Sequence, residues 1–498
     1  MYDLLTSNGG LYIKIGQAIG NNAALLPRPI QEKFAKLFDD APQVPFPVIL
    51  KVFQAEFGRP PTGPDGVFEE FEERAAASAS VAQVHRAKLK SPDGNGQWVA
   101  VKVQKPAVGK QVNWDLGSYR VVMWLYENYV FKLPVYFAVD HLRQELDFEL
   151  EAQNAERTAQ FVAQEPSLSG RVYIPKVYPE YTTKRIMTAE WIDGIRLSDR
   201  PGIFRLMGEE DPGAKHASVP PPSTVPFTSA PLKGGVRAIM STMVDLFSAQ
   251  IFSWGWVHCD PHPGNVIIRP NPKNPSHPQL VLIDHGLYVS MPEDFRQQYA
   301  TVWKSLLIQD LDTVIKVTQQ WGIGAPDLFA SATLLKPVRF GSDKELARKA
   351  EKWVAMTDYE QSVAMKAKLQ TFLVDTDAMP KELLFIGRNM RIVQGNNQMF
   401  GSPVNRIRIT GNWASRSLAV AYPHLTFTER LRHYTDHFAF VVVMLAVDIA
   451  FISSKTRQWF RARMGWSSEG FEDELERSMR GYAKKNFGVE LAENAFYG

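Results

Sequence analysis

The chain has 498 residues, of which 45% are hydrophobic and 22% are charged, and its formal net charge is +3. These values are typical of a globular protein with a large core, and they exclude a chain that is disordered as a whole. The single cysteine, Cys259, excludes an intrachain disulfide. Because the small net charge is spread along the chain, we expect no nucleic-acid partner.

The N-terminal part of the chain shows no transit or signal segment. The residues after Met1 lack both a basic-then-apolar pattern and an Arg-rich stretch, so either the protein is not N-terminally targeted or the sequence begins late. Apolar spacing predicts helices over 11–57, including a second helical period from Phe46 to Phe57. Prolines and glycines over 60–66 then predict a break.

A hairpin and a further strand follow. Alternating residues from Val81 to Leu89, a turn at 91–96 and a valine-rich strand pattern over 98–104 predict two antiparallel strands. A long helical stretch is predicted from about 112 to 163, and another strand over 185–192.

The second half of the chain is mostly helical by pattern, from 289 to 490. Before it, residues 207–233 are rich in Pro, Ser and Gly, which predicts a disordered surface insertion. Residues 270–278 contain four prolines, which predicts a second, shorter loop insertion.

One apolar run, over 438–452, allows two interpretations. It is shorter than the ~18–20 residues that a membrane span needs, which favours a buried core helix. The alternative is a helix that is embedded in a membrane or lies on it. Arg457, Arg461 and Arg463 follow the run and would suit an anionic membrane surface.

The most specific pattern consists of residues 258–265 followed by residues 282–286. Phosphoryl transfer needs magnesium held by an acid and an amide, and a carboxylate that orients the attacking oxygen. Asp260 and Asn265 have the spacing of a kinase catalytic loop, and Asp284 ends an apolar strand. We therefore predict ATP and Mg2+ as ligands, with Asp260 as the catalytic carboxylate and Asn265 and Asp284 as metal ligands.

The predicted strand over 98–104 contains a lysine, Lys102. In kinases a strand lysine of this kind holds the α- and β-phosphates and pairs with a helix glutamate. That glutamate is expected from the acidic segment 144–151, in which Asp147 and Glu151 share a helix face. Taken alone, Lys102 could be an ordinary edge-strand lysine, but the nearby catalytic pattern favours the phosphate role.

Small residues occupy the position of a kinase glycine-rich loop. Glycines let backbone N–H groups approach phosphates, whereas the side chains of this loop should stiffen it and change how a triphosphate sits. A plain small-residue turn would have the same composition. The loop residues, which we predict to contact nucleotide, are Ala77, Ser78, Ala79 and Ser80.

The strand over 185–192 is the candidate hinge for adenine. Backbone groups of Glu190 and Ile192 would bind the edge of the base, and Ala189 would lie behind it. A plain buried strand predicts the same pattern.

Together these motifs resemble the UbiB family of atypical kinase-like proteins, also called aarF-domain-containing or ABC-one kinases. The catalytic segment is most similar to the mitochondrial aarF-domain branch. Five motifs match in order over roughly residues 10–320, namely Lys14-Ile-Gly-Gln17, the Ala77–Ser80 loop, Lys102, Glu145-Leu-Asp147 with Glu151, and the set Asp260, Asn265 and Asp284.

The resemblance implies an α+β, bilobal protein-kinase-like fold with a small β-rich N-lobe and a helical C-lobe. It also implies that Glu151 is the partner of Lys102 and takes part in catalysis with it. The expected units are an N-terminal helical extension over 1–66, an N-lobe with inserted helices over 67–195, a C-lobe over 196–330, and a C-terminal helical extension over 331–498.

A gating role is also implied by the resemblance. Lys14 and Gln17 share a helix face, and in the family this helix packs where a protein substrate would enter a typical kinase. Glu145 and Asp147 are expected to meet it there. Taken alone, Lys14 would be an ordinary surface lysine.

Several residues depart from a typical protein kinase. His262 stands where such kinases have a lysine, and a neutral imidazole would stabilise a transferring phosphate less than a fixed cation. His285 replaces a phenylalanine. After Gly286 the chain enters a helix without a long activation segment, so the usual platform for a peptide substrate is missing.

We therefore expect an ATPase, or a phosphotransferase that acts on small or lipid-linked molecules. The first alternative is an ATP-gated scaffold that binds lipid or protein with little phosphoryl transfer. The second is an ordinary protein Ser/Thr kinase. An aminoglycoside-phosphotransferase-like enzyme shares the catalytic loop, but it would lack the Lys14–Gln17 and Glu145–Asp147 pairs.

The resemblance implies a biological setting as well. It implies a role in coenzyme Q or mitochondrial lipid homeostasis, with a lipid or quinone-pathway client. It further implies a mitochondrial location that is associated with the inner membrane, with membrane contact through 438–452.

Overall fold

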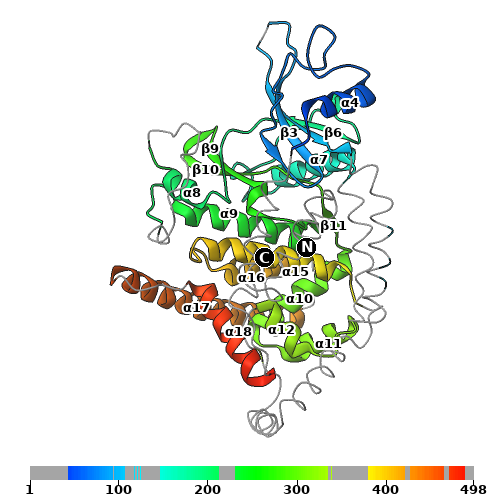
Figure 1. Ribbon diagram of the computed structural model, residues 1–498. Coiled ribbons are helices and arrows are strands. Elements are labelled where there is room, and N and C mark those ends of the chain that lie inside the picture. Colours follow the sequence, from blue (N-terminus) through cyan, green and yellow to red (C-terminus); the bar gives the residue numbers. More distant parts are fainter. Residues whose placement is uncertain are drawn as a thin grey trace.

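The computed structural model describes residues 43–334, 338, 379–420, 427–464 and 470–487, apart from residues 94, 107–116, 118–120, 122–123, 125–145 and 212–229. Over these residues the chain forms an upper lobe built on a sheet and a larger, mostly helical lower part (Figure 1). The expected α+β architecture is confirmed.

The upper lobe contains a five-stranded sheet with the order β1-β3-β4-β6, in which β2 also pairs with β3. The predicted hairpin is confirmed, because β3 and β4 are antiparallel with Ala82 opposite Gln104. The predicted strand over 185–192 is confirmed as β6. The strands are β1 (Glu70–Phe71), β2 (Ala77–Ser78), β3 (Ala82–Lys88), β4 (Trp98–Gln104) and β6 (Ile186–Glu190).

Two helices pack against this sheet. Helix α4 (Phe46–Phe57) has the bounds that its helical period predicts, and it buries Phe53 in a cluster with Val99, Val101 and Val103 of β4. Helix α7 (Phe148–Gln164) begins with Phe148 buried in the larger cluster of the lower part. Helix α7 therefore connects the sheet to the helical core.

The lower part begins with short strands and helices that carry the catalytic pattern. One small sheet has the order β5-β10-β9-β7, and β8 pairs with β11. The elements are β5 (Val172–Tyr173), a 3-10 turn η3 (Pro179–Tyr181), β7 (Ile195–Arg196), α8 (Arg200–Met207), α9 (Gly235–Ala249), a π turn η5 (Gln250–Trp254), β8 (Trp256–His258), a 3-10 turn η6 (Pro263–Asn265), β9 (Val266–Asn271), β10 (Asn274–Leu282) and β11 (Tyr288–Ser290).

The expectation of a loop insertion over 270–278 is wrong. Strands β9 and β10 form an antiparallel hairpin here, with Pro278 opposite Pro270 and an irregular register between Asn274 and Pro278. The turn is closed by the side chain of Asn271, which accepts a hydrogen bond from the Lys273 N–H at 2.9 Å. Proline has no N–H to donate, but this irregular end of the hairpin tolerates it.

The bounds expected for the disordered insertion, 207–233, are too wide. Leu232 is buried and its N–H donates to the Leu206 carbonyl at 3.1 Å, while Lys233 N–H donates to the Ser276 carbonyl at 2.7 Å. Both ends of the segment therefore belong to the fold. The central residues, 212–229, lie outside the described residues.

The described residues from 293 onward are mostly helical, as predicted. Helix α16 packs against both α9 and α10, α15 and α16 lie beneath the catalytic strands, and α17 projects from the body (Figure 1). The helices are α10 (Glu293–Ile308), α11 (Leu311–Gln320), α12 (Pro326–Leu334), α15 (Glu382–Met399), α16 (Arg406–Val420), α17 (Phe427–Arg463) and α18 (Phe471–Phe487).

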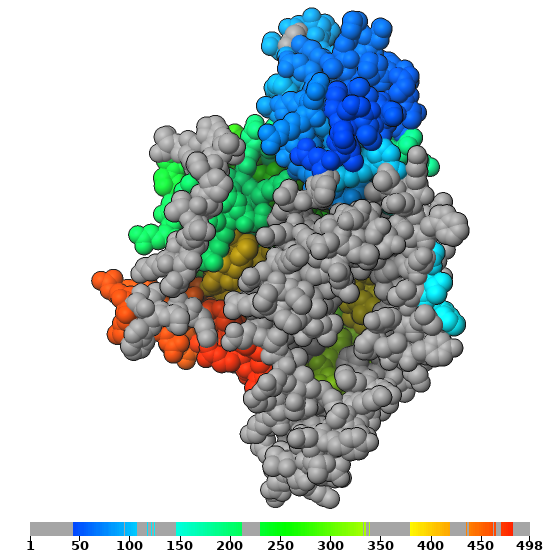
Figure 2. Space-filling view, in the orientation of Figure 1, coloured from blue at the N-terminus to red at the C-terminus, as the bar shows by residue number. Residues whose placement is uncertain are grey.

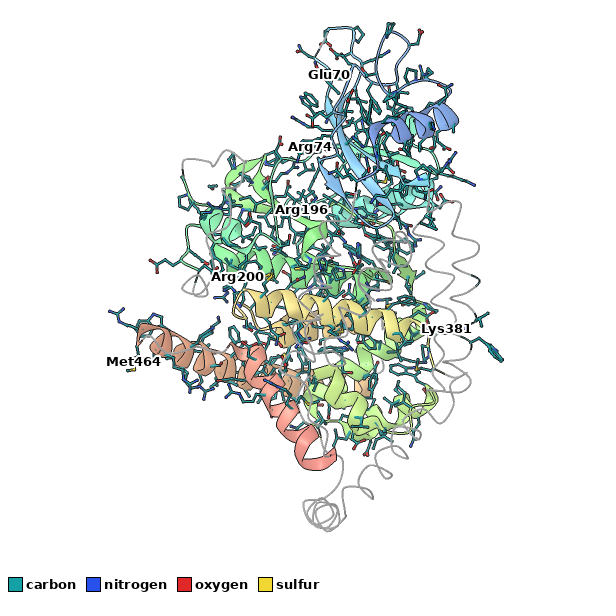
Figure 3. All side chains as sticks on the ribbon, viewed as in Figure 1. Glu70, Arg74, Arg196, Arg200, Lys381 and Met464 are labelled. Atoms are coloured by element: carbon teal, nitrogen blue, oxygen red, sulfur yellow. The ribbon has the colours of Figure 1, made fainter. Side chains whose placement is uncertain are left out.

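The described elements form two lobes, and helix α17 projects from the lower one (Figure 1). In Figure 3, Glu70 and Arg74 mark the upper lobe, while Arg196 and Arg200 mark the lower part. Met464, which follows α17, lies at one outer edge of the view. The space-filling view shows the upper lobe standing above the lower part (Figure 2).

Helix α17 is not the buried core helix that the length of its apolar run favours. Its segment Phe438–Arg461 has 24 residues, a mean hydropathy of 2.0 over its most apolar stretch, and only 22% of that stretch buried. By length and composition this segment is long enough to cross a membrane. The candidate span is longer than the apolar run because it also includes Asp448 and the mostly polar and basic residues after Ile452.

Candidate functional site

Lys102 and Glu151 form a buried ion pair between the sheet and α7. Lys102 Nζ lies 2.6 Å and 2.8 Å from the two carboxylate oxygens of Glu151, whose side chain is 1% exposed. Asp284 Oδ2 lies 3.7 Å from the same Nζ. The structure thus brings together three residues that stand far apart in the sequence.

The charges at this pair are set by burial and by its neighbours. Burial alone would lower the pKa of Lys102, but the carboxylates of Asp284 and Glu151 outweigh it, and the pKa is raised above its usual range. Burial raises the pKa of Glu151, and its ion pair with Lys102 opposes that effect. Lys102 therefore remains a fixed cation at the edge of the site.

The backbone that carries Asp284 is held by buried side chains. His258 Nε2 lies 2.9 Å from the Asp284 carbonyl oxygen, and Asn154 donates to the His285 carbonyl at 3.0 Å. The His285 N–H donates to Glu151 Oε1 at 3.4 Å. The backbone at the metal-ligand candidate Asp284 is therefore held by several buried side chains, one of which, Glu151, also pairs with Lys102.

His285 itself is a buried, neutral side chain. Burial lowers its pKa to about 3. Its Nδ1 lies 2.9 Å from the Tyr288 hydroxyl and its Nε2 lies 3.1 Å from the Leu282 carbonyl oxygen. These partners assign the ring proton to Nε2. At the position where typical protein kinases have a phenylalanine, this chain thus has a histidine that is held in place by hydrogen bonds.

Strand β8, which leads into the catalytic loop, begins directly after a sharp turn at Gly255. This residue has φ +59°, in the left-handed region that favours glycine, and its carbonyl accepts from the Met291 N–H at 2.8 Å. At the other end of β8, the Asp260 N–H donates to His258 Nδ1 at 2.9 Å. These contacts set the direction in which Asp260 leaves the strand.

Asn265 and Asp284 lie at the same edge of the small sheet. Val266 of β9 stands opposite Leu282 of β10, and the Ile283 N–H donates to the Asn265 carbonyl at 3.0 Å. The Asn265 side chain also donates to the Asp260 carbonyl at 3.4 Å. Residues from two separate motifs are thereby placed around one point.

The donor set at this edge fits magnesium. Mg2+ is usually bound by one or two protein carboxylates together with substrate phosphates and water, and rarely by a cage of protein ligands. One carboxylate, Asp284, and one amide, Asn265, match that pattern. Among the described residues there is no cluster of three or more His, Cys, Asp or Glu side chains that could hold a metal by itself.

The small-residue loop is tied to a lysine that sequence reasoning missed. The side chain of Lys105, just past β4, is buried and donates to the Ala79 carbonyl at 2.6 Å. Ser78 and Ser80 are also buried, whereas Ala79 is exposed. Lys105 thus anchors the loop through the backbone carbonyl of its exposed residue, Ala79.

Hydrogen bonds within the protein reduce the number of backbone groups at the candidate hinge that could bind adenine. The Glu190 N–H donates to the Lys176 carbonyl at 2.8 Å, and the Glu190 side chain accepts from the Tyr173 hydroxyl. This leaves the Glu190 carbonyl oxygen, and not its N–H, as the group for an adenine edge. Ile192 lies two residues after the end of β6, and its side chain is buried.

Of the four predicted gating residues, only Asp147 can be placed. It is the N-cap of α7, and its side chain accepts from the backbone N–H groups of Glu149 and Leu150 at 3.1 and 3.2 Å. Lys14, Gln17 and Glu145 lie outside the described residues. The gating role stays a prediction.

Helix α15 supplies a residue that was not predicted. Arg388 Nη2 lies 3.0 Å from Asp260 Oδ1. The residues are 128 positions apart, and Arg388 lies in a helix whose sequence carries no recognised motif, so no local signal could have found the pair.

The lysine–glutamate pair, the catalytic loop and the metal-ligand edge lie where two lobes of a protein-kinase-like fold meet. The chain belongs to the ABC1 atypical kinase-like family, whose domain model matches residues 36–318. The predicted resemblance is therefore confirmed.

Relatives agree with this assignment. An ABC1 family protein of Purpureocillium lilacinum is 40% identical over 95% of this chain and 78% of its own length. A probable serine/threonine-protein kinase of Dictyostelium discoideum is 32% identical over 84% of this chain and 54% of its own length. AarF domain-containing protein kinase 1 of Xenopus tropicalis is 33% identical over 65% of this chain and 55% of its own length. Family and relatives together support a kinase-type enzyme.

Proposed function

We propose that this protein binds Mg-ATP at the Lys102 site and acts as an ATPase or as a phosphotransferase on a small or lipid-linked molecule. The observation that carries the proposal is the buried Lys102–Glu151 pair, with Asp284 3.7 Å from the lysine. Lysine in this setting serves to hold α- and β-phosphates, and the nearby carboxylates serve metal binding and the orientation of the nucleophile.

Each residue has a part in the proposed reaction. Lys102 would neutralise and orient the nucleotide phosphates, while Asp260 would orient the attacking hydroxyl or water. Asn265 and Asp284 would hold the metal, which supplies charge stabilisation to the phosphates when it is bound. The Ala77–Ser80 loop would cover the nucleotide.

The chain after Asp284 supports a client other than a peptide. Strand β11 begins at Tyr288 and helix α10 begins at Glu293, so very few residues separate the metal-binding segment from the next helix. A protein kinase uses a long segment at this point to hold its peptide. Trans-phosphorylation of peptides is therefore the less favoured alternative.

We further propose that α17 places the enzyme on a membrane. Its outward side carries a continuous apolar stripe, consisting of Phe438, Val441, Val442, Leu445, Ile449 and Ile452. Asp448, which interrupts the run in the sequence, is turned inward, where it accepts from Asn405 at 3.2 Å and pairs with Arg408. The stripe therefore contains no charge.

The end of α17 supports a membrane occupant over a protein partner. Exposed Trp459 and Phe460 stand next to Arg461 and Arg463. Aromatic and basic residues beside an apolar stripe suit the boundary between acyl chains and anionic headgroups. By family resemblance, the membrane we propose is the mitochondrial inner membrane, and the client belongs to coenzyme Q or lipid homeostasis.

ATP hydrolysis by purified protein, measured with and without cardiolipin-containing liposomes, tests the proposal. We expect magnesium-dependent hydrolysis that Asp260→Ala and Asp284→Ala abolish. Absence of Mg-nucleotide binding, or binding that Asp284→Ala leaves unchanged, would contradict it.

The same assay separates the alternatives. Hydrolysis stimulated by liposomes without a phosphorylated product would favour the ATP-gated scaffold. Phosphate transfer to added peptides by the unmodified chain would favour a protein Ser/Thr kinase.

A further inference from the structure

The carboxylate of Asp260 is engaged by a side chain from outside the matched kinase-like domain. Arg388 lies on α15, beyond the segment 36–318 that the family model covers, and its Nη2 is 3.0 Å from Asp260 Oδ1. A guanidinium can hold a carboxylate in one orientation because its N–H groups form a rigid planar fork.

This pair contributes little to folding. The side chains of Arg388 and Asp260 are 45% and 38% exposed. Ion pairs with this much solvent contact typically contribute little to stability, since water screens them. Stability therefore does not explain why the cation meets this particular carboxylate.

Helix α15 is itself fixed to the catalytic loop at several points. The buried side chain of Asn389, next to Arg388, donates to the His258 carbonyl at 2.5 Å. Asn396, two turns further along, donates to the Pro261 carbonyl at 3.0 Å. Phe385 packs against the cluster that contains buried Cys259. Helix α15 thus forms hydrogen bonds with the catalytic loop on both sides of Asp260.

The catalytic loop carries His262 at the position where protein kinases have a lysine, so a cation near Asp260 has to come from another element. Its Nδ1 accepts a hydrogen bond from the Gly264 N–H at 3.2 Å, so this nitrogen is used to shape the loop. Sequence position 262 therefore holds a loop-forming imidazole where protein kinases carry a lysine.

We propose that Arg388 is a positioning residue for Asp260, and that α15 completes the phosphotransfer site of this protein. Arg388 holds the carboxylate at Oδ1, so that the remaining carboxylate oxygen is presented to the attacking hydroxyl or water. The inference rests on the proposed function, because it concerns the same reaction.

Steady-state ATP hydrolysis by Arg388→Gln and Arg388→Lys tests this role. The matched control is Arg391→Gln, which removes an exposed cation from the same helix one turn away; the described part of the chain gives Arg391 no ion pair. We expect Arg388→Gln to lower kcat on the order of 10- to 100-fold, because misplaced catalytic groups cost about that much. KM for ATP and Tm should stay near wild type, and Arg388→Lys should recover part of kcat.

Three outcomes would overturn the inference. An unchanged kcat in Arg388→Gln would remove the positioning role, and a raised kcat would show that Arg388 restrains the site. Equal losses in Arg388→Gln and Arg391→Gln, with a lowered Tm in both, would show a folding role. If the wild-type protein binds no Mg-nucleotide, the proposed function fails and this inference falls with it, whereas the three outcomes above leave the proposed function standing.

Discussion

The Lys102–Glu151 pair is a buried charge pair whose two members depend on each other. Glu151 is 1% exposed, so removal of its charge leaves Lys102 facing only Asp284. Breaking a buried pair by removing one partner commonly costs about 3–5 kcal/mol. The pair is thus a structural element as well as a part of the site.

Glu151→Gln should therefore weaken Mg-ATP binding at least about tenfold and lower Tm, since the lysine loses its main anchor. Isothermal titration and thermal unfolding measure the two effects. Glu149→Gln, an exposed change on the same helix, serves as the control. Equal nucleotide affinities in both variants would contradict the assigned role of Glu151.

Lys105 predicts a specific dependence on pH. Burial lowers its pKa to about 8, below the usual value of 10.5. Between about pH 8 and 10.5 the unfolded chain therefore binds more protons at this residue than the folded chain, so its contribution to stability rises with pH. Relative to Lys105→Met, the wild-type Tm should increase over this window. A Tm difference that does not change with pH would show that Lys105 titrates normally.

The sequence was a good guide to some of these residues and not to others. Lys102, Asp260, Asn265 and Asp284 stand in patterns whose spacing is required by one chemistry, so the pattern alone locates them. Lys105 looks like any lysine after a strand, and only its contact with the Ala79 carbonyl reveals its place. Residue pairs formed by tertiary packing leave no local signature.

The Ala77–Ser80 loop is the element whose mobility should decide nucleotide preference. Its exposed residue Ala79 is held through its carbonyl by Lys105, and both serines are buried. Ala79→Gly keeps that carbonyl but releases the backbone. We expect altered ratios of ADP to ATP affinity, or increased self-phosphorylation. Equilibrium binding and incorporation of labelled phosphate measure these, and unchanged values would remove the loop as a regulator.

Elements were predictable where local rules and tertiary structure agree. Helix α4 and the β3–β4 hairpin match their predicted bounds because apolar periodicity and turn chemistry both specify them. The β9–β10 hairpin was missed because prolines normally mark loops, although the partner strand and the Asn271 turn stabilise it here. Strand pairing outweighed the local composition.

At the scale of the whole molecule, α17 should determine where the protein resides. Placing a charge in its apolar stripe, as in Leu445→Glu or Ile449→Glu, should reduce binding to cardiolipin-containing liposomes, because an acid in the acyl region costs several kcal/mol. Liposome flotation measures the loss. Leu50→Glu, which changes an exposed leucine on α4 away from the stripe, should bind like wild type, and ATP hydrolysis without liposomes should be retained.

The two-lobed fold could be foreseen from the ordered motifs, but the position of α17 could not. An apolar run in a sequence does not distinguish a helix face that is covered by protein from one that is covered by a membrane. Here Phe440 and Met444 lie toward Gly411 of α16, whereas the opposite side of the helix faces outward. Burial of such a helix depends on its neighbours in space.

The hydrogen bonds around His285 also bear on pharmacology. Some kinase inhibitors need the metal-binding segment to turn outward and open a pocket behind it. In this protein that movement would break the contacts of His285 with Tyr288, Leu282 and Asn154, and would expose a buried imidazole. Compounds that dock against the segment in its present position should therefore bind more tightly than compounds that require it to flip.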